Sequence, residues 1–500
     1  MTRQRLFEFA ALLLILSLAL YLRSANVATN PAWYTDEGTH LDIARHLLQG
    51  RMQYLAINQS WLLLSRLPLF EVLLAVLARL NGASTETLRW LTGSLGVVTV
   101  AILYGVLRRI QLGRVRWFPL LAALLLAIYP PAVVYSRFGF SYNLLAPLLL
   151  IVQLAMWECT SFRSRRWLAV SSLLIGLGTL CDLWMFVMLA PFAMIVLIRH
   201  WRDLLWSIPL ALLPFGLYVA IMLIIAPSAF WFDARFVMSR LNQLPLEQQL
   251  ATLAQNVIVL TRQDAWLGLG AIGLVVLRPA RLRGIALAFF AIPIVLLGRT
   301  TALFSLSFYY LIPLLPFVAL GVASLIRFGV PLIVGWVLKP PPADRAVALV
   351  AILIAVVLSG STLALVSQVR DGFHTDIDAF LLNPVDAMPV AQVINQRVQI
   401  DDVVIASPAL AWALNANVAD MQMPLAYAGR ATPHLPADVP TERWAFNPAY
   451  QRARFVVVDN LWHNWALPDV AGMAEMLNDI EAWPVAFRAG DVVVYQNPVR

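Results

Sequence analysis

A polar stretch near the N-terminus holds the residues best suited to chemistry. Residues 33–42 read WYTDEGTHLD. A carboxylate held beside an acceptor hydroxyl can take its proton and accelerate attack about 10²–10⁴-fold. Asp36 and Glu37 are neighbours, so on a helix they point about 100° apart and cannot flank one bond as the two acids of a hydrolase do. We expect one base and one supporting acid.

The same stretch also fits a plain structural role. Thr35 or Asp36 is a suitable helix N-cap, and acids in a first turn are favoured by the helix dipole. The two roles are compatible, because one carboxylate can cap a helix and also act as a base.

The elements around this stretch are those of a membrane protein. The chain has 500 residues, of which 60% are hydrophobic and 13% charged, against about 45–50% and about 25% in soluble domains. Mean hydropathy is +0.75. Cys159 and Cys181 both lie in apolar runs and indicate no disulfide framework. Disordered, collagen-like and disulfide-stapled classes are excluded, and a polytopic membrane protein is predicted.

Apolar runs that can cross a bilayer as helices of about 20 residues recur up to residue 366. We predict about 11 spans, near 6–23, 88–107, 117–135, 144–158, 167–181, 183–198, 204–226, 265–278, 284–298, 308–326 and 346–366. The first span follows two arginines and lacks a small-residue cleavage site, so we interpret it as an anchor. Charges and Pro68 interrupt residues 61–80, which we expect to lie in the membrane interface.

Basic residues set the predicted orientation, because cytoplasmic loops are enriched in them. With a cytoplasmic N-terminus, the inside loops hold 17 basic residues and the outside loops 11. This predicts a multi-pass protein of the plasma (inner) membrane with an extracytoplasmic C-terminus.

Two domains are predicted. A transmembrane domain covers residues 1–366, with outer loops at 24–87 and 227–264. Amphipathic helices at 38–50 and 244–263 are expected to lie along the membrane; for the second, a core-facing stripe is an equal alternative.

Residues 367–500 differ from the rest of the chain. Segments 401–406, 454–459 and 491–495 have the pattern of strands, and 470–480 is helix-like. Residues 371–500 hold 7 basic and 15 acidic residues, against 29 and 13 before them. The basic excess therefore belongs to membrane loops and does not indicate nucleic-acid binding. The predicted fold is mainly α, a polytopic membrane helical bundle with outer interfacial helices and a small C-terminal extracytoplasmic α/β domain.

The order of these motifs resembles the GT-C class of membrane glycosyltransferases, and most of all the protein O-mannosyltransferases and the aminoarabinose transferases that act on lipid A. The likeness covers roughly residues 1–330. Its features are the Asp-Glu pair after the first span, a helix ending in Leu-Leu-Gln-Gly, Pro68-Leu69, Tyr135-Ser136-Arg137, Gly176–Leu180, and Arg299 before Phe308-Tyr309-Tyr310.

The resemblance implies inverting transfer of a sugar from a polyprenyl-phosphate donor to a hydroxyl of a lipid, glycan or protein acceptor on the outer face. The family's catalytic base maps onto Asp36, and Glu37 matches the second acid of the motif. A phosphate leaving group needs cations rather than a general acid. Arg137 and Arg299 suit that role; their alternative is an arginine whose head extends to the lipid headgroups.

Four further residues are candidates for substrate binding: His40, Asn143, Asp182 and Tyr309. Asn143 lies in a loop where several relatives carry an acid, and Asp182 stands where many carry a lysine. Asp182 suits a helix cap equally well. His40 and His46 are six residues apart, which is poor spacing for a metal pair, so no metal site is predicted and a divalent metal is left open.

A rival hypothesis is a non-enzymatic transporter or binding protein for lipid-linked sugars. The missing acid beside Asn143 favours it. Against a transporter, the ionisable residues gather at the predicted outer ends of the spans, whereas transporter sites usually lie near the midplane.

Overall fold

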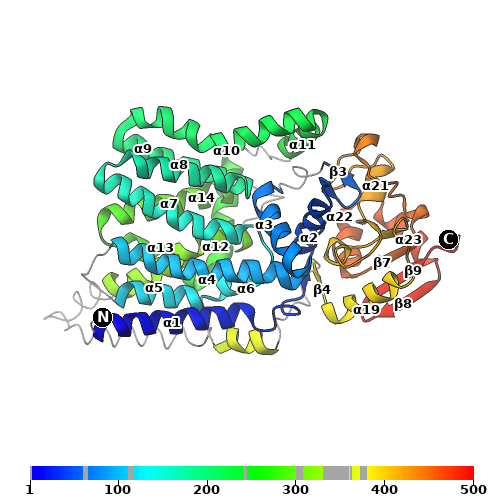
Figure 1. Ribbon diagram of the computed structural model, residues 1–500, viewed down its shortest axis with the longest axis horizontal. Helices are drawn as coiled ribbons and strands as arrows, with labels where there is room; N and C mark the ends of the chain where they lie inside the picture. The colour runs from blue at the N-terminus through cyan, green and yellow to red at the C-terminus, as the bar shows by residue number, and fades with distance from the viewer. Residues whose placement is uncertain are drawn as a thin grey trace. The chain divides into compact units, whose positions relative to one another are not determined.

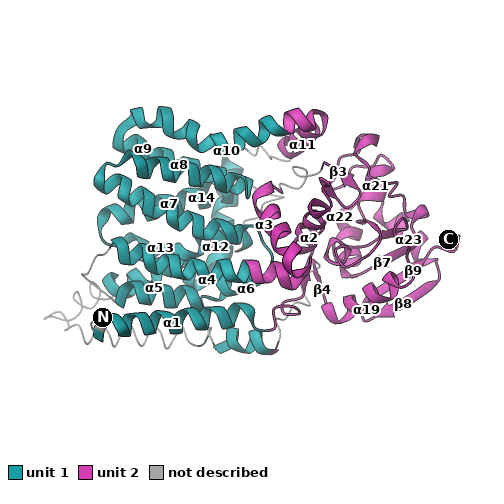
Figure 2. Cartoon of the chain, in the orientation of Figure 1, with its two compact units in different colours: residues 1–25, 92–221, 240–370 teal, residues 26–91, 222–239, 371–500 magenta. Residues whose placement is uncertain are grey.

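The chain divides into two compact units in the computed structural model (Figure 2). The structure describes residues 3–59, 66–110, 117–239, 245–299, 308–329, 360, 363–371 and 380–499. Unit 1 comprises residues 1–25, 92–221 and 240–370, and unit 2 comprises residues 26–91, 222–239 and 371–500. The predicted domains divide the chain once, near residue 366. The structure instead groups the segment after the first helix with the C-terminal residues.

Unit 1 is helical, as its long apolar runs predict (Figure 1). Its elements, with α4 beginning in unit 2, are α1 (Arg3–Ser24), α4 (Thr85–Ile110), α5 (Trp117–Ile128), α6 (Pro130–Ser136), α7 (Tyr142–Phe162), α8 (Arg165–Thr179), η1 (Leu183–Met188), α9 (Leu189–His200), η2 (Trp201–Asp203), α10 (Leu204–Ile225), α12 (Leu246–Gln263), α13 (Ala265–Val275), α14 (Ala280–Gly298), α15 (Phe308–Leu311), η3 (Ile312–Leu314), α16 (Leu315–Ser324) and η4 (Leu325–Gly329).

Six helical segments in the described part of the chain are long and apolar enough to cross a membrane. The number rises to eight if α5–α6, bent by 58°, and α12–α13, bent by 109°, are each one span. A multi-pass membrane protein is thus confirmed, although the predicted number of spans is higher. Helix α8 has 15 residues, fewer than a full crossing needs, and the predicted span at 346–366 falls largely outside the described residues.

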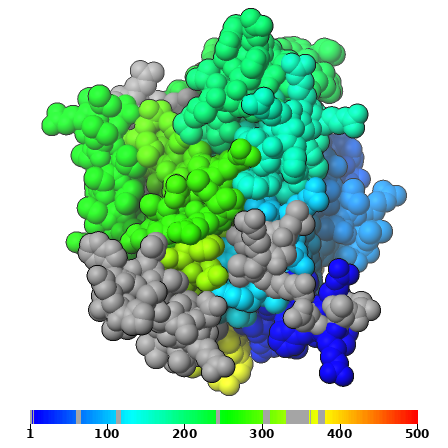
Figure 3. Space-filling view, turned by 90° about the vertical axis from the view of Figure 1, so that its left-hand side faces the viewer, coloured from blue at the N-terminus to red at the C-terminus, as the bar shows by residue number. Residues whose placement is uncertain are grey.

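Close helix packing in unit 1 depends on glycine at one crossing. A Cβ on Gly273 of α13 would lie 1.8 Å from the Gly321 carbonyl oxygen of α16. Small residues at such crossings let two helix backbones approach within a membrane. In the space-filling view, blue N-terminal residues lie at the lower right and green helices at the left and top, with cyan helices between them (Figure 3).

Helix α12 covers most of the second segment expected to be amphipathic, 244–263. Leu246, Leu250 and Val257 of its apolar stripe are exposed, and Leu260 is buried. The exposed stripe argues against the core-facing alternative, and a position along the membrane stays a prediction.

Unit 2 combines short helices and strands from three parts of the chain. They are β1 (Trp33–Tyr34), α2 (Thr35–Leu48), β2 (Gln53–Tyr54), β3 (Ile57–Asn58), α3 (Pro68–Asn81), α11 (Pro227–Ser239), β4 (Leu381–Leu382), α19 (Pro384–Asn395), β5 (Val403–Ile405), α20 (Pro408–Ala411), β6 (Asn417–Ala419), α21 (Met423–Tyr427), η5 (Thr441–Arg443), η6 (Tyr450–Arg452), β7 (Phe455–Val458), η7 (Trp462–Ala466), α22 (Leu467–Asp469), α23 (Met473–Glu481), β8 (Val485–Ala489) and β9 (Val492–Gln496).

A five-stranded sheet with the order β6-β5-β7-β9-β8 organises the C-terminal residues. Strand β5 is parallel to β6 and β7, whereas β9 is antiparallel to β7 and β8. Every residue of β5 and β7 is buried, as expected for Val-rich strands covered on both faces. The three segments for which the sequence predicts strands form β5, β7 and β9.

The segment after the first helix is built into this unit. Strand β1 pairs with β4 through Trp33–Leu382 and Tyr34–Leu381, and α2 packs on α3 and α20. A Cβ on Gly38 would lie 1.7 Å from the Pro408 carbonyl oxygen, so only glycine allows this approach. The amphipathic prediction for 38–50 needs correction, because the described chain itself buries residues 37–44 of α2.

Helix α3 falls in the segment 61–80 that we expect to lie in the interface. It has 14 residues, too few to cross a bilayer. Residues 61–65 lie outside the described residues.

Candidate functional site

The candidate site begins where α2 follows β1. The N-cap is Tyr34, with extended backbone angles, so the prediction of Thr35 or Asp36 as cap is wrong by one or two residues. Glu37, in the third helical position, accepts a hydrogen bond from the Tyr34 backbone N–H at 2.9 Å. The acid of the motif that stabilises the helix start is therefore Glu37, which leaves Asp36 for other contacts.

Glu37 is held by a buried arginine that the sequence did not single out. Arg89, from α4, donates through Nε to Oε1 at 2.7 Å and through Nη2 to Oε2 at 2.6 Å. Both side chains are fully buried. Arg89 also donates to the carbonyls of Val27, Pro31 and Ala32. The pair therefore fixes the backbone that leads into α2. In this position the Glu37 carboxylate is sealed from solvent and its contacts are all to the protein.

Asp36 lies next to Glu37 in a different environment. Its side chain is 35% exposed, and Oδ1 accepts a hydrogen bond from Arg66 Nη2 at 2.5 Å. A carboxylate with one charged partner and an open side can take a proton from an incoming hydroxyl, which is the geometry a base requires.

His40, one turn along α2, connects to the same arginine. Its Nδ1 lies 2.7 Å from Glu71 Oε1 of α3, and its Nε2 lies 3.3 Å from Arg66 Nη1. A guanidinium only donates, so Nε2 must accept and Nδ1 must carry the proton.

Burial defines what His40 can do. It is 1% exposed, and its ring packs edge-on against Phe70 at a centroid distance of 4.8 Å. It therefore holds Arg66 rather than a substrate. Glu71 Oε2 is also buried and has no hydrogen-bond partner within the described ranges.

A tyrosine borders the same end of α2. The Tyr54 hydroxyl lies 3.4 Å from Thr39 Oγ1. Burial, and next the charge of Asp420, raises the pKa of Tyr54 well above its usual value. Tyr54 therefore stays protonated and remains a hydrogen-bond donor.

Comparison with known proteins finds one matching family model and several similar structures. The family model described as dolichyl-phosphate-mannose-protein mannosyltransferase matches residues 65–231. The structure of ArnT from Cupriavidus metallidurans bound to undecaprenyl phosphate is similar over 97% of each chain, with 16% identity and a TM-score of 0.67. The structure of the same protein in the apo state is similar with a TM-score of 0.63.

A more distant structure has the same architecture. The Archaeoglobus fulgidus oligosaccharyltransferase matches over 90% of this chain and 69% of its own, with 13% identity and a TM-score of 0.54. The chain has the fold of the GT-C membrane glycosyltransferases. No curated protein matches the sequence.

Arg137, the predicted phosphate ligand, donates its hydrogen bonds to backbone carbonyls. It follows α6 in unit 1, is fully buried, and donates to the carbonyls of Leu22 and Ala25 at 2.8 and 2.6 Å. These carbonyls end α1, where helix carbonyls lack intrahelical partners. Arg137 therefore contacts the end of the first helix, and its role as a phosphate ligand stays a prediction.

Asn143 and Asp182 also have structural contacts in unit 1. Asn143 Nδ2 donates to the carbonyls of Tyr135, Phe138 and Phe140 at 3.0–3.3 Å and so organises its own loop. Asp182 Oδ1 accepts from the Trp184 N–H at 2.8 Å and caps η1. The capping alternative for Asp182 is therefore confirmed.

Arg299 and Tyr309 remain accessible candidates of unit 1. Arg299 is exposed at the C-terminal end of α14. The Tyr309 ring is partly buried and stacks on Phe140 at 5.5 Å within an aromatic cluster that also holds Tyr142 and Tyr310.

The structure brings Asp36, Glu37 and His40 together in unit 2 and adds Arg66, Glu71 and Arg89 to them. Arg66 has a sequence signal, because it is one of the charges that interrupt the apolar segment 61–80. The sequence does not point to Glu71 and Arg89 as partners, because they lie 31 and 52 residues from His40 and Glu37. In the part of the chain that the structure describes, no three His, Cys, Asp or Glu side chains are arranged to hold a metal ion.

Proposed function

We propose that the protein is a membrane glycosyltransferase that moves a sugar from a polyprenyl-phosphate donor to an acceptor hydroxyl, with Asp36 as the general base. The GT-C fold and the family match over residues 65–231 support the reaction class. The ArnT relative is named as bound to undecaprenyl phosphate, which supports the lipid-linked donor. The single observation that carries the assignment is the half-open Asp36 carboxylate at the start of α2.

The proposed reaction is a direct displacement. Asp36 accepts the proton of the acceptor hydroxyl as its oxygen attacks the anomeric carbon. The bond between that carbon and the phosphate oxygen breaks, and polyprenyl phosphate leaves with the electron pair. Attack opposite the phosphate inverts the anomeric configuration. The acceptor is a lipid, a glycan or a protein.

Arg66 acts on the base through geometry. Its planar guanidinium contacts Asp36 Oδ1 at 2.5 Å and fixes the orientation of the carboxylate. His40 and Glu71 hold Arg66 from the other side through the contacts at 3.3 and 2.7 Å. We propose Arg66, His40 and Glu71 as positioning residues.

The leaving phosphate requires a cation. We propose Arg299, which is exposed, with Tyr309 beside the sugar or carrier. Arg137 is left out, because its guanidinium already holds the end of α1. We further propose that unit 2 lies on the extracytoplasmic side of the plasma (inner) membrane, with a cytoplasmic N-terminus.

The test is sugar transfer from a panel of radiolabelled polyprenyl-phosphate sugars, with the full chain in membranes. Asp36→Asn should lower turnover at least about 100-fold with donor binding retained, because general base catalysis is lost. The matched control is Glu86→Gln, an exposed acid in the first turn of another helix of unit 2, which should retain full activity.

Two results would count against the proposal. Full activity of Asp36→Asn would remove the base from the mechanism. Donor binding without transfer by the wild type would favour a non-enzymatic transporter or binding protein.

A further inference from the structure

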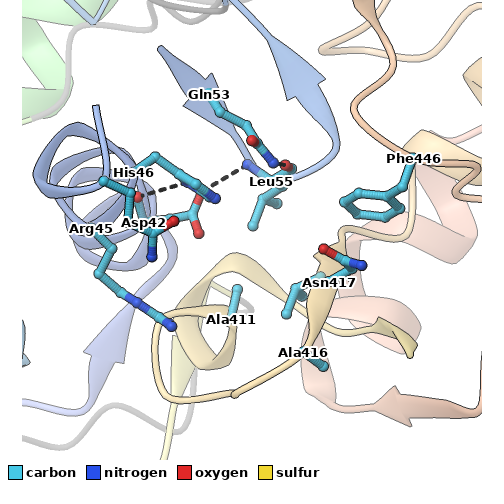
Figure 4. Close-up of a pocket in the computed structure, with 11 residues that line it drawn as sticks. Asp42, Arg45, His46, Gln53, Leu55, Ala411, Ala416, Asn417 and Phe446 are labelled. Atoms are coloured by element: carbon cyan, nitrogen blue, oxygen red, sulfur yellow. Dashed lines mark hydrogen bonds and ion pairs between the residues drawn. The ribbon is translucent and has the colours of Figure 1, made fainter. Parts of the chain in front are cut away.

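A hollow separate from the candidate site lies along α2, farther from the start of the helix than Asp36 (Figure 4). It belongs wholly to unit 2. Side chains from α2, from the segment that follows it, from β6 and from the chain near Phe446 line it. Neither the proposed base nor Glu37 is among the lining residues.

Asp42 supplies an acceptor to this hollow. The residue is 5% exposed. Its Oδ2 accepts from the Leu55 N–H at 2.7 Å and lies 3.3 Å from His46 Nδ1. Its Oδ1 accepts no hydrogen bond within the described ranges. Asp42 is therefore fixed by two protein contacts and still has one oxygen to offer.

Two more side chains have one polar atom in a protein contact and another left over, and a third points into the hollow. Gln53 Nε2 donates to the Leu55 carbonyl at 2.6 Å, which leaves its amide oxygen for a ligand. Arg45 Nη1 donates to the carbonyls of Trp412 and Leu414, which leaves Nη2. The Asn417 amide points into the hollow across from α2 (Figure 4).

The chemistry of this lining favours a neutral sugar. One carboxylate and one guanidinium balance each other, and the other polar groups are amides and a histidine. An anion site gathers several cations or backbone N–H groups, whereas paired donors and acceptors match hydroxyls, which both donate and accept. The Phe446 ring borders the same space (Figure 4) and offers an apolar face to the C–H side of a sugar ring.

We propose that this pocket, formed by Asp42, Arg45, His46, Gln53, Asn417 and Phe446, binds a neutral sugar unit of the acceptor. The inference rests on the proposed function. A helix rises about 1.5 Å per residue, so Asp42 and His46 lie about 9 and 15 Å along α2 from Asp36. Binding energy from a sugar unit held at this distance from the base can orient the reacting hydroxyl.

The test uses the full chain in lipid nanodiscs, which contain no sugar-headed detergent. The probes are methyl α-D-mannopyranoside, methyl β-D-galactopyranoside and methyl α-L-arabinofuranoside, with binding measured by saturation-transfer NMR. At least one glycoside should bind the wild type and Asp36→Asn equally. Asn417→Ala should weaken that binding about 3–10-fold, as expected for one lost hydrogen bond. Asn415→Ala is the matched control, since Asn415 is exposed and does not line the pocket.

The possible failures are distinguishable. Absence of glycoside binding, binding of inorganic phosphate alone, or equal affinity in Asn417→Ala and the wild type overturns the pocket assignment, whatever the transfer assay shows. Glycoside binding that depends on Asn417, in a protein that transfers no sugar from any donor, supports the pocket and overturns the proposed function instead.

Discussion

Buried arginines find different partners in the two units. In unit 1, Arg23 donates to the carbonyls of Ala19, Leu126 and Ala127, and Arg137 donates to carbonyls at the end of α1. In unit 2, Arg89 forms a two-pronged pair with Glu37. Arg443 does the same with Asp233, at 3.0 and 3.2 Å.

The difference follows from the surroundings. An acidic partner within a membrane would itself be expensive to bury, whereas helix ends supply carbonyls that need donors. Unit 2 holds most of the chain's acidic residues, and Arg89 and Arg443, which are buried there, each pair with a buried carboxylate. Buried arginines thus anchor the backbone in unit 1 and hold carboxylates in unit 2. Among the ion pairs of unit 2, the partly exposed Asp36–Arg66 pair is the one that we expect to react.

The largest expected effect comes from breaking the sealed pair of unit 2. Arg89→Ala leaves Glu37 as a buried charge without its cation, which should cost about 3–5 kcal/mol of folding free energy. Hydrogen exchange should show residues 26–59 and 380–499 losing protection.

Arg79→Ala is the control for this change, because Arg79 is an exposed arginine of α3 in the same unit. A loss of under about 1 kcal/mol in Arg89→Ala would mean that the pair is no stronger than a surface salt bridge.

A smaller effect is expected from the backbone-anchoring arginine of unit 1. Arg137→Ala removes two charge-assisted hydrogen bonds to carbonyls, which should cost about 1.5–3 kcal/mol. Thermal inactivation in detergent measures it, with exposed Arg281→Ala as the control. If Arg137→Ala instead abolished transfer while stability was unchanged, Arg137 would be a phosphate ligand and the anchoring role would be rejected.

The smallest effect concerns a buried acid of unit 2 that backbone N–H groups hold. Asp420 Oδ1 accepts from Gln422 and Met423 N–H at 2.8 and 3.1 Å, while burial raises its pKa to about 6. The folded protein therefore binds this proton more tightly than the unfolded chain does. The associated stability is present at low pH and is lost as pH rises through about 6.

Asp420→Asn keeps the acceptor oxygen and cannot ionise. From pH 4.5 to pH 7.5, the free energy of unfolding of the variant should rise relative to that of the wild type by on the order of 1–2 kcal/mol. Thermal unfolding at both pH values measures this change. An equal difference at the two pH values would show that Asp420 does not titrate in this range.

Sequence patterns predicted the parts of the molecule that local physics decides. Apolar runs located the helices of unit 1, and Val-rich segments located β5, β7 and β9. The number of crossings was harder, because the bends between α5 and α6 and between α12 and α13 depend on packing. The position of Asp36 after the first helix also follows from sequence order, whereas its role as a base remains a prediction.

The partners within the site could not be predicted. Glu37 and Arg89 are 52 residues apart, and nothing local selects Arg89 over the other arginines nearby. Likewise, Gly38 looks like an ordinary weak helix residue until Pro408 is seen against it. When two residues meet only through tertiary packing, their spacing in the sequence does not predict the contact.

The pairing of β1 with β4 dictates when this unit can be completed during synthesis. Tyr34 and Leu381 are strand neighbours, and at roughly 5–20 residues per second the ribosome needs roughly 20–70 seconds to make the chain between them. Until then α2 can already meet α3 and Arg66, the partner of Asp36, but it lacks α20, and β1 lacks β4. The helix that carries the proposed base is therefore packed on one side long before its other side can be covered.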